Sequence, residues 1–424
     1  MAFQIQSFMQ TCRGYILRQD SSRYLFFLSV CLFFGVIPIR VDTSLFVVIM
    51  TALGIWAWRG SGAFGEVMRS PARYAIWGYL LFGFAALAGT VLNPESYRYY
   101  LRVVVWGACA FTGIALSRCM PQHNYAFFWG TLAGLCLSFL GACILVGFND
   151  PSLWHEERLK LFAVHPVRLG LYCSVTFLFC LNAYGIAKTR LGMGFCAAAV
   201  LFSGWLTYLT NTRGIILLLP LAVLGIAWTL PRKNLLRFAV AVGVVVALCI
   251  TGAVMGKSSF TGGRLVSAIT NTTEDSTFKT RLPIWEAAWE AFKDSPVVGH
   301  GVASFTKLHR KYLLDNRDDW DVRYNRLYEE RAKHTHNFTL GRMVDSGIIG
   351  TAGFFLFYGL AIIAAWRGPK EGRWVTSLLV FYMLSMQFDD GFSRINDALI
   401  MITAGSALGI PRTVREKGEP DAVV

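Results

Sequence analysis

A histidine and an asparagine stand directly before a long apolar run, in the stretch HTHNF at residues 334–338. The run SGIIGTAGFFLFYGLAIIAAW that follows predicts a membrane helix, so His336 and Asn337 would lie near its N-terminus. The partial positive charge there disfavours imidazolium, and a neutral imidazole is what a general base needs. A histidine that caps a helix or rests among lipid headgroups would have the same position, so position alone leaves both interpretations open.

Four arginines stand near predicted membrane boundaries on the same side as this histidine: Arg168, Arg213, Arg264 and Arg281. Arg213 lies in the short hinge TNTRG between two apolar runs, where a charge is costly unless it is paired or meets an anion. Guanidinium groups bind phosphate oxygens bidentately, and a diphosphate offers two phosphate groups. Several arginines facing one site would therefore favour a diphosphate ligand, whereas each arginine alone could be an interfacial anchor.

Acidic and metal-binding residues give a weaker signal. Asp389, in FDDGFSR, could orient His336 through its second ring nitrogen, or it could be solvated or paired with Arg394. The outer loops hold no evident cage of acids, and the 10 cysteines form no CxxC pair. We therefore expect no metal site and no cofactor.

The elements that position these residues are membrane helices. The chain is 54% hydrophobic and 16% charged, whereas a soluble domain carries about 25% charged residues. Its apolar runs are each long enough to cross a bilayer, which predicts an all-α polytopic membrane protein with about 12 transmembrane helices. The predicted spans are 24–39, 44–58, 74–92, 99–117, 125–147, 167–187, 191–210, 214–230, 237–256, 346–365, 374–388 and 395–410.

The distribution of basic residues predicts the orientation. Alternate connections and both ends hold 18 Lys and Arg residues, against 6 in the opposite short loops. The positive-inside rule therefore places both termini in the cytoplasm and the first apolar run in the membrane as a retained helix. The net charge of +14 is then a consequence of topology, since the basic residues are spread over separate cytoplasmic segments, and we expect no nucleic-acid partner.

The predicted spans divide the chain into three regions: 1–256 with helices 1–9, an outer loop domain at 257–345, and 346–424 with helices 10–12 and a cytoplasmic tail. The loop domain holds four of the seven histidines and many aromatic residues, so we expect it to be ordered.

One helix is predicted with some detail in this loop. The segment RLPIWEAAWEAFKDSP has Pro283 in a first turn and an apolar stripe of Trp285, Ala288, Trp289 and Phe292. We expect this helix to lie along the membrane surface or to cap the bundle. A second helix is plausible over residues 320–333.

Three motifs, taken together, resemble the O-antigen ligase family. TNTRG resembles its Ser/Thr-Arg-Gly signature, RLPIWEAAWEAFKDSPVVGHG its Arg-x-x-x-Trp helix followed by Pro-x-x-Gly-x-Gly, and HNFTLGRMVDSGIIG its His-Asn segment. The motifs occur in the family's order and span about 140 residues, whereas the N-terminal 150 residues match only in general character. The helix count and the large periplasmic loop between helices 9 and 10 also agree with the family.

The resemblance implies a glycosyltransferase of the bacterial inner membrane, with its active site on the periplasmic side. Such an enzyme moves O-antigen from undecaprenyl pyrophosphate to the lipid A-core oligosaccharide, so both partners are lipids. By this analogy His336 is the base, Arg213 and Arg281 hold the diphosphate, and Asp389 is a weaker assignment. Further candidates for binding the substrate or its pyrophosphate are Arg168, Arg264 and Asn337. The chemistry needs no metal if arginines neutralise the leaving group, and direct displacement would invert the anomeric carbon.

Three alternatives remain open. An O-antigen polymerase, or another lipid-linked glycan ligase, would use the same kind of donor with a different acceptor. A polysaccharide transporter or flippase would favour ionisable residues at mid-membrane, whereas nearly all charges here lie at loop level. A metal-dependent oligosaccharyltransferase would need more acids in the outer loops.

Overall fold

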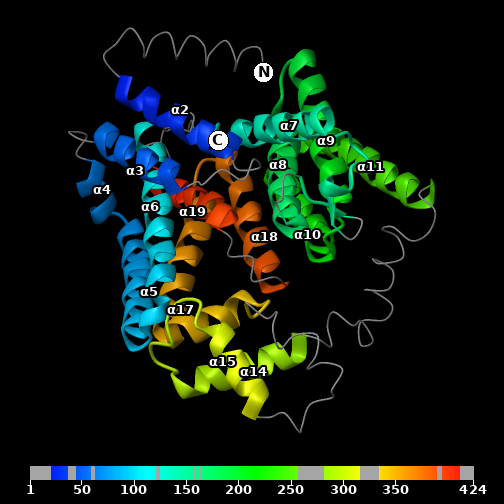
Figure 1. Ribbon diagram of the computed structural model, residues 1–424. Helices are drawn as coiled ribbons and strands as arrows, with labels where there is room; N and C mark the ends of the chain where they lie inside the picture. Colours follow the sequence, from blue (N-terminus) through cyan, green and yellow to red (C-terminus); the bar gives the residue numbers. More distant parts are fainter. Residues whose placement is uncertain are drawn as a thin grey trace.

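The structure, a computed structural model, is almost entirely helical (Figure 1). In the part of the chain that the structure describes, the one sheet is a short antiparallel ribbon of β1 (Trp154–His155) and β2 (Arg158–Leu159). The 3-10 turns there are η2 (Pro94–Ser96), η3 (Pro151–Leu153) and η4 (Lys370–Gly372). The structure describes residues 21–36, 44–58, 63–120, 125–155, 158–161, 165–255, 281–315, 334–388 and 394–410.

Each predicted span overlaps a helix. Within the described residues, six helices are long and apolar enough to cross a membrane by length and composition: α5, α6, α7, α8, α9 and α17. Five further apolar helices are shorter, and α11 occupies the predicted ninth span. The helices are α2 Ser21–Val36, α3 Ser44–Trp58, α4 Ala63–Arg69, α5 Ala72–Leu92, α6 Tyr97–Cys119, α7 Phe128–Leu145, α8 Pro166–Ile186, α9 Arg190–Leu209, α10 Arg213–Thr229, α11 Arg232–Met255, α14 Arg281–Asp294, α15 Phe305–Asp315, α17 Phe338–Trp366, α18 Trp374–Phe388 and α19 Arg394–Gly409.

The largest differences from the predicted boundaries are at the starts of α11 and α17. Helix α11 begins at Arg232 rather than at 237, so the basic residues expected in a loop form its first turns. Helix α17 begins at Phe338 rather than at 346, because Asn337 caps an earlier start. The short α4 and α15 were not predicted, and the plausible helix over 320–333 lies outside the described residues.

Large apolar side chains lie on the outside of the bundle as well as in its core. Phe84, Ile144 and Trp228 are exposed on α5, α7 and α10, although side chains of this size are buried in soluble proteins. Inside, glycines let helices approach closely: a Cβ on Gly78 of α5 would lie 2.8 Å from the carbonyl oxygen of Gly353 on α17. Both features are typical of helices packed in lipid.

Helix α14 caps the bundle with a face shifted by one residue from the predicted stripe. Its buried Ile284, Ala287, Ala288 and Ala291 pack with α15 and with the first turns of α17, and Trp285 is partly buried against them. Trp289 is 46% exposed and lies against Phe292, away from that contact. Helix α14 ends at Asp294 as predicted, but the small residues rather than the tryptophans allow its close approach to α17.

The helical hydrogen bonding of α17 is interrupted at Gly347, which has φ 61° and ψ −167°. In an unbroken helix, Ile348 and Ile349 would donate to the carbonyls of Val344 and Asp345. Here Ile348 donates to the Pro296 carbonyl (2.8 Å) and Ile349 donates to Val297 (3.3 Å).

The two carbonyls left over by the break are also bonded. The N–H of His300 donates to Val344 (2.8 Å) and the N–H of Gly301 donates to Asp345 (3.0 Å). The segment 296–301 therefore replaces both missing helical hydrogen bonds. We call it the splint loop.

The splint loop also contacts the end of α5. Gly299 and Gly301 both have positive φ, at 70° and 89°. A Cβ on Gly299 would lie 2.5 Å from the amide nitrogen of Ser346, and one on Gly301 would lie 2.9 Å from the Gly89 carbonyl. The spacing Pro-x-x-Gly-x-Gly is thus required by a backbone that passes between two helices without room for side chains.

The first prediction concerns the break. Gly347→Ala should destabilise the protein, because a Cβ would overlap the Val297 carbonyl at a left-handed φ, and strain of this kind costs about 1–3 kcal/mol before any clash. Gly359→Ala is the matched control on α17, since nothing lies within 4 Å of its Cβ position. Thermal unfolding in detergent should show a lower Tm for the first variant alone. Equal Tm values would show that the break tolerates a side chain.

Candidate functional site

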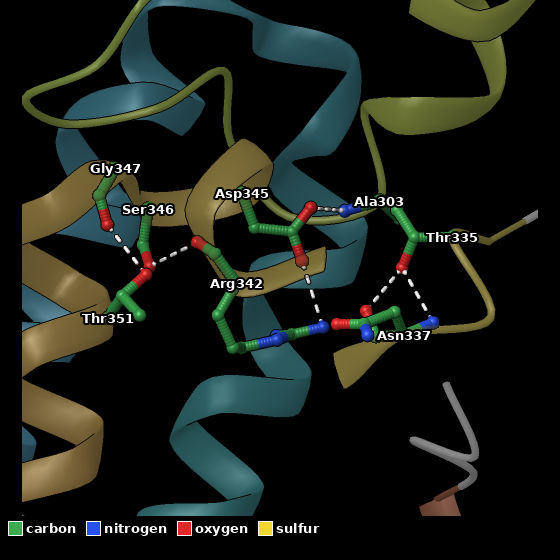
Figure 2. A network of polar contacts seen from close by, with 8 residues as sticks. All are labelled: Ala303, Thr335, Asn337, Arg342, Asp345, Ser346, Gly347 and Thr351. Carbon is green, nitrogen blue, oxygen red and sulfur yellow. Dashed lines mark hydrogen bonds and ion pairs between the residues drawn. The ribbon is translucent and has the colours of Figure 1, made fainter. Parts of the chain in front are cut away.

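The start of α17 is tied to the end of α18. Asn337 is the N-cap of α17, and its Oδ1 accepts from the N–H of Leu340 at 3.0 Å. Its Nδ2 donates to the Gln387 carbonyl at 3.4 Å, while the Thr339 hydroxyl donates to Oε1 of Gln387 at 2.7 Å. Thr335 adds a tight turn, since its hydroxyl donates to the Asn337 carbonyl at 2.6 Å (Figure 2). The predicted substrate-binding Asn337 therefore has a structural role at this corner.

His336 lies in the turn that enters the helix. Its φ is 50°, in the left-handed region that few residues with a side chain adopt. Its ring is half-buried and meets the ring of His334 edge to face, with centroids 4.1 Å apart. The strained backbone holds the imidazole at the entrance of α17, and strain of this kind is concentrated at functional sites.

The turn with Arg213 lies beside the turn with Arg168. Thr210, Asn211 and Thr212 are buried, and Arg213 is the first residue of α10. A Cβ on Gly170 in α8 would lie 2.7 Å from the Thr210 hydroxyl oxygen. The first turn of α8, which includes the exposed Arg168, therefore packs against the α9–α10 connection.

Helix α18 links these turns to the start of α17. Gly225, near the end of α10, lies against Ser377, near the start of α18, so the packed helices run in opposite directions. From Gly225 back to Arg213 is 225 − 213 = 12 residues, and from Ser377 to Phe388 is 388 − 377 = 11. At 1.5 Å per residue, the two lengths are about 18 and 17 Å. The start of α10 and the end of α18, beside Asn337, thus lie at the same depth along the bundle axis.

The remaining predicted site residues divide into two groups. Arg281 is the half-exposed first residue of α14, the helix that packs on the first turns of α17. The structure thus places the helix starts that carry Arg168, Arg213 and Arg281 at the same end of the bundle as His336. Arg264 and Asp389 lie outside the described residues, so their predicted roles stay predictions.

Sequence reasoning missed a buried ion pair beside this corner. Arg342 and Asp345 lie on α17, with Nη2 and Oδ2 3.0 Å apart and both side chains about 5% exposed. The sequence held a signal for this pair, because residues three apart on a helix lie on the same face, where opposite charges can pair.

The arrangement brings an imidazole and several guanidinium groups to one end of a helical bundle. Within the described residues, no group of three or more His, Cys, Asp or Glu side chains could hold a metal ion. Guanidinium groups of this kind suit phosphate oxygens, which they bind bidentately.

Comparison with known proteins agrees with the motifs. Residues 197–355 match the family described as O-Antigen ligase, and this segment contains all three motifs. The exopolysaccharide production protein ExoQ of Rhizobium meliloti (strain 1021) is 24% identical over 303 residues, which cover 68% of this chain. The chain spans 66% of that relative, slightly less than two thirds of its length.

The comparisons confirm the resemblance and support the O-antigen ligase/polymerase superfamily, whose members act on lipid-linked polysaccharides. Together with the apolar helices, they indicate a multi-pass membrane protein.

A buried histidine in the cap of the bundle yields the second prediction. His309 on α15 is 2% exposed and lies against Phe305, and burial lowers its pKa from 6.5 to about 4. The folded protein therefore keeps this imidazole neutral while the unfolded chain protonates it near pH 6.5. Below pH 6.5 the unfolded state binds more protons, so the stability of the α14–α15 cap should fall as pH drops from 6.5 to 4.

Hydrogen exchange of peptides from residues 281–315, corrected for intrinsic rates, should show this loss of protection. In His309→Leu, which cannot titrate, the dependence should flatten over the same pH range. An unchanged pH dependence in the variant would assign the effect to other groups.

Proposed function

We propose that the protein is an O-antigen ligase, which moves O-antigen from undecaprenyl pyrophosphate to the lipid A-core oligosaccharide. The observation that supports this most is that His336 and Arg213 lie at the same depth along the bundle. Helix α18 packs against α10, and its Gln387 binds Asn337, which follows His336. The reaction needs a base and cationic groups at one place, next to two lipid substrates. The proposal places this end of the bundle on the periplasmic side of the inner membrane, with both termini in the cytoplasm.

In the proposed reaction, an acceptor hydroxyl attacks the anomeric carbon of the donor sugar. His336 takes the hydroxyl proton as the new C–O bond forms. The bond to the diphosphate breaks, and its electron pair leaves on undecaprenyl pyrophosphate. Arg213 and Arg281 stabilise that charge, with Arg168 and Arg264 as further contacts, so the step needs no metal ion. Because the acceptor displaces the diphosphate directly, the anomeric centre is inverted.

An O-antigen polymerase is the second candidate. It would use the same donor and the same base, but its acceptor would be another lipid-linked glycan. The relative named for exopolysaccharide production favours this alternative, whereas the matched family description favours the ligase.

The third prediction tests the base. His336→Ala should insert and fold normally but lose transfer by roughly 10²- to 10⁴-fold, the usual contribution of general base catalysis. The assay mixes purified protein in nanodiscs and EDTA with undecaprenyl-pyrophosphate glycan and lipid A-core, and follows the gel mobility of the core. If the variant transfers glycan to the lipid A-core at the wild-type rate, His336 is not the base. If the lipid-linked glycan lengthens and the lipid A-core receives no glycan, the protein is a polymerase.

The fourth prediction tests the diphosphate contact. Arg213→Lys keeps the charge but loses the planar guanidinium that binds a phosphate bidentately. Losing one charge-assisted hydrogen bond of about 1.5–3 kcal/mol corresponds to roughly 10- to 160-fold slower transfer. Arg232→Lys is the matched control, because Arg232 likewise begins a helix, α11, on the side predicted to be cytoplasmic. Full activity of Arg213→Lys would make this arginine an interfacial anchor.

A further inference from the structure

The Arg342–Asp345 ion pair lies next to the break in α17, where both charges are removed from water (Figure 2). Desolvation offsets much of the attraction in such a pair, so a buried pair is often no more stabilising than apolar residues of similar volume. Stability alone is therefore a weak reason for placing two charges here. Their contacts indicate what else the pair does.

Asp345 binds Gly301, the last residue of the splint loop, and Ala303, two residues beyond it. Its Oδ1 accepts from the N–H of Ala303 at 3.0 Å, while its backbone carbonyl accepts from Gly301. Ala303 has φ 62°, a conformation that is unfavourable for a residue with a Cβ. The carboxylate thus holds a strained residue in place, and it fixes the chain that leads back to α14 and Arg281.

Arg342 connects the same pair to the bundle. Its guanidinium carbon lies 5.6 Å from the ring centroid of Trp106 on α6 and 5.3 Å from that of Phe338. Phe338 directly follows Asn337, the cap beside His336. The guanidinium is therefore held between two aromatic rings, one from the bundle and one from the corner with the proposed base.

We infer that Asp345, acting through Arg342 and Ala303, is a positioning residue for the proposed transfer. The pair sets the relative placement of two parts of the site: the corner with His336 and the α14 segment with Arg281. It touches no reacting atom itself. The inference rests on the proposed function, because it assigns no activity of its own.

The fifth prediction compares kinetics and stability in three variants. Asp345→Asn should lower kcat roughly 10- to 100-fold with donor KM within about threefold, since misplacement of catalytic groups affects the transition state most. In the double variant Arg342→Gln/Asp345→Asn, no charge is left unpaired. Its Tm should return toward that of the wild type while its kcat stays low, and it serves as the test if the single variant fails to fold.

Glu290→Gln is the matched control, because Glu290 forms an exposed pair of the same spacing with Lys293 on α14 (2.6 Å). Its kcat should stay within about twofold of wild type, as expected for an exposed ion pair. Recovery of kcat together with Tm in the double variant, or a double variant as unstable as the single one, would reduce the pair to a folding role. Absence of transfer by the wild type would instead overturn the proposed function, and this inference with it.

Discussion

The structure depends on one constraint, that backbone hydrogen-bonding groups cannot be left unpaired in an apolar interior. Helix α17 breaks at Gly347, which frees two N–H groups and two carbonyls. The splint loop, 296–301, bonds all four. Non-helical backbone at membrane depth is tolerated only where protein buries and satisfies it. A loop that follows α14 is therefore built into a membrane helix, and the cap and the bundle become one unit at this point.

The site takes its rigidity from that unit. The break separates the first turns of α17, with Asn337 as their cap, from the longer part that packs on α5. The first turns are bonded to α18 through Gln387 and are covered by α14. Groups that must act together on a diphosphate and a hydroxyl gain most when their placement is fixed before the substrates bind. In the proposed function, the first turns of α17, held in place by the splinted break, provide such placement for His336 without long loops.

Charged residues near this corner are arranged by what surrounds them. Arg342 lies against aromatic rings and a carboxylate inside the protein, whereas Arg168 is exposed in the first turn of α8 and Arg281 is half-exposed at the start of α14. In the proposed function, the buried arginine serves positioning, and the arginines near helix starts bind the anionic leaving group.

The sequence by itself determined the helices and their boundaries in most cases, because the length of an apolar run is a local property. The bounds of α3 and α18 agree with the predicted 44–58 and 374–388. Motif spacing also named the histidine and arginine candidates, whose roles stay predictions. Only the tertiary structure decided the break at Gly347, the packing face of α14 and the partner of Asp345, whose bond to Ala303 spans 42 residues. Those features depend on which distant backbone groups meet, and no local pattern of polarity records that.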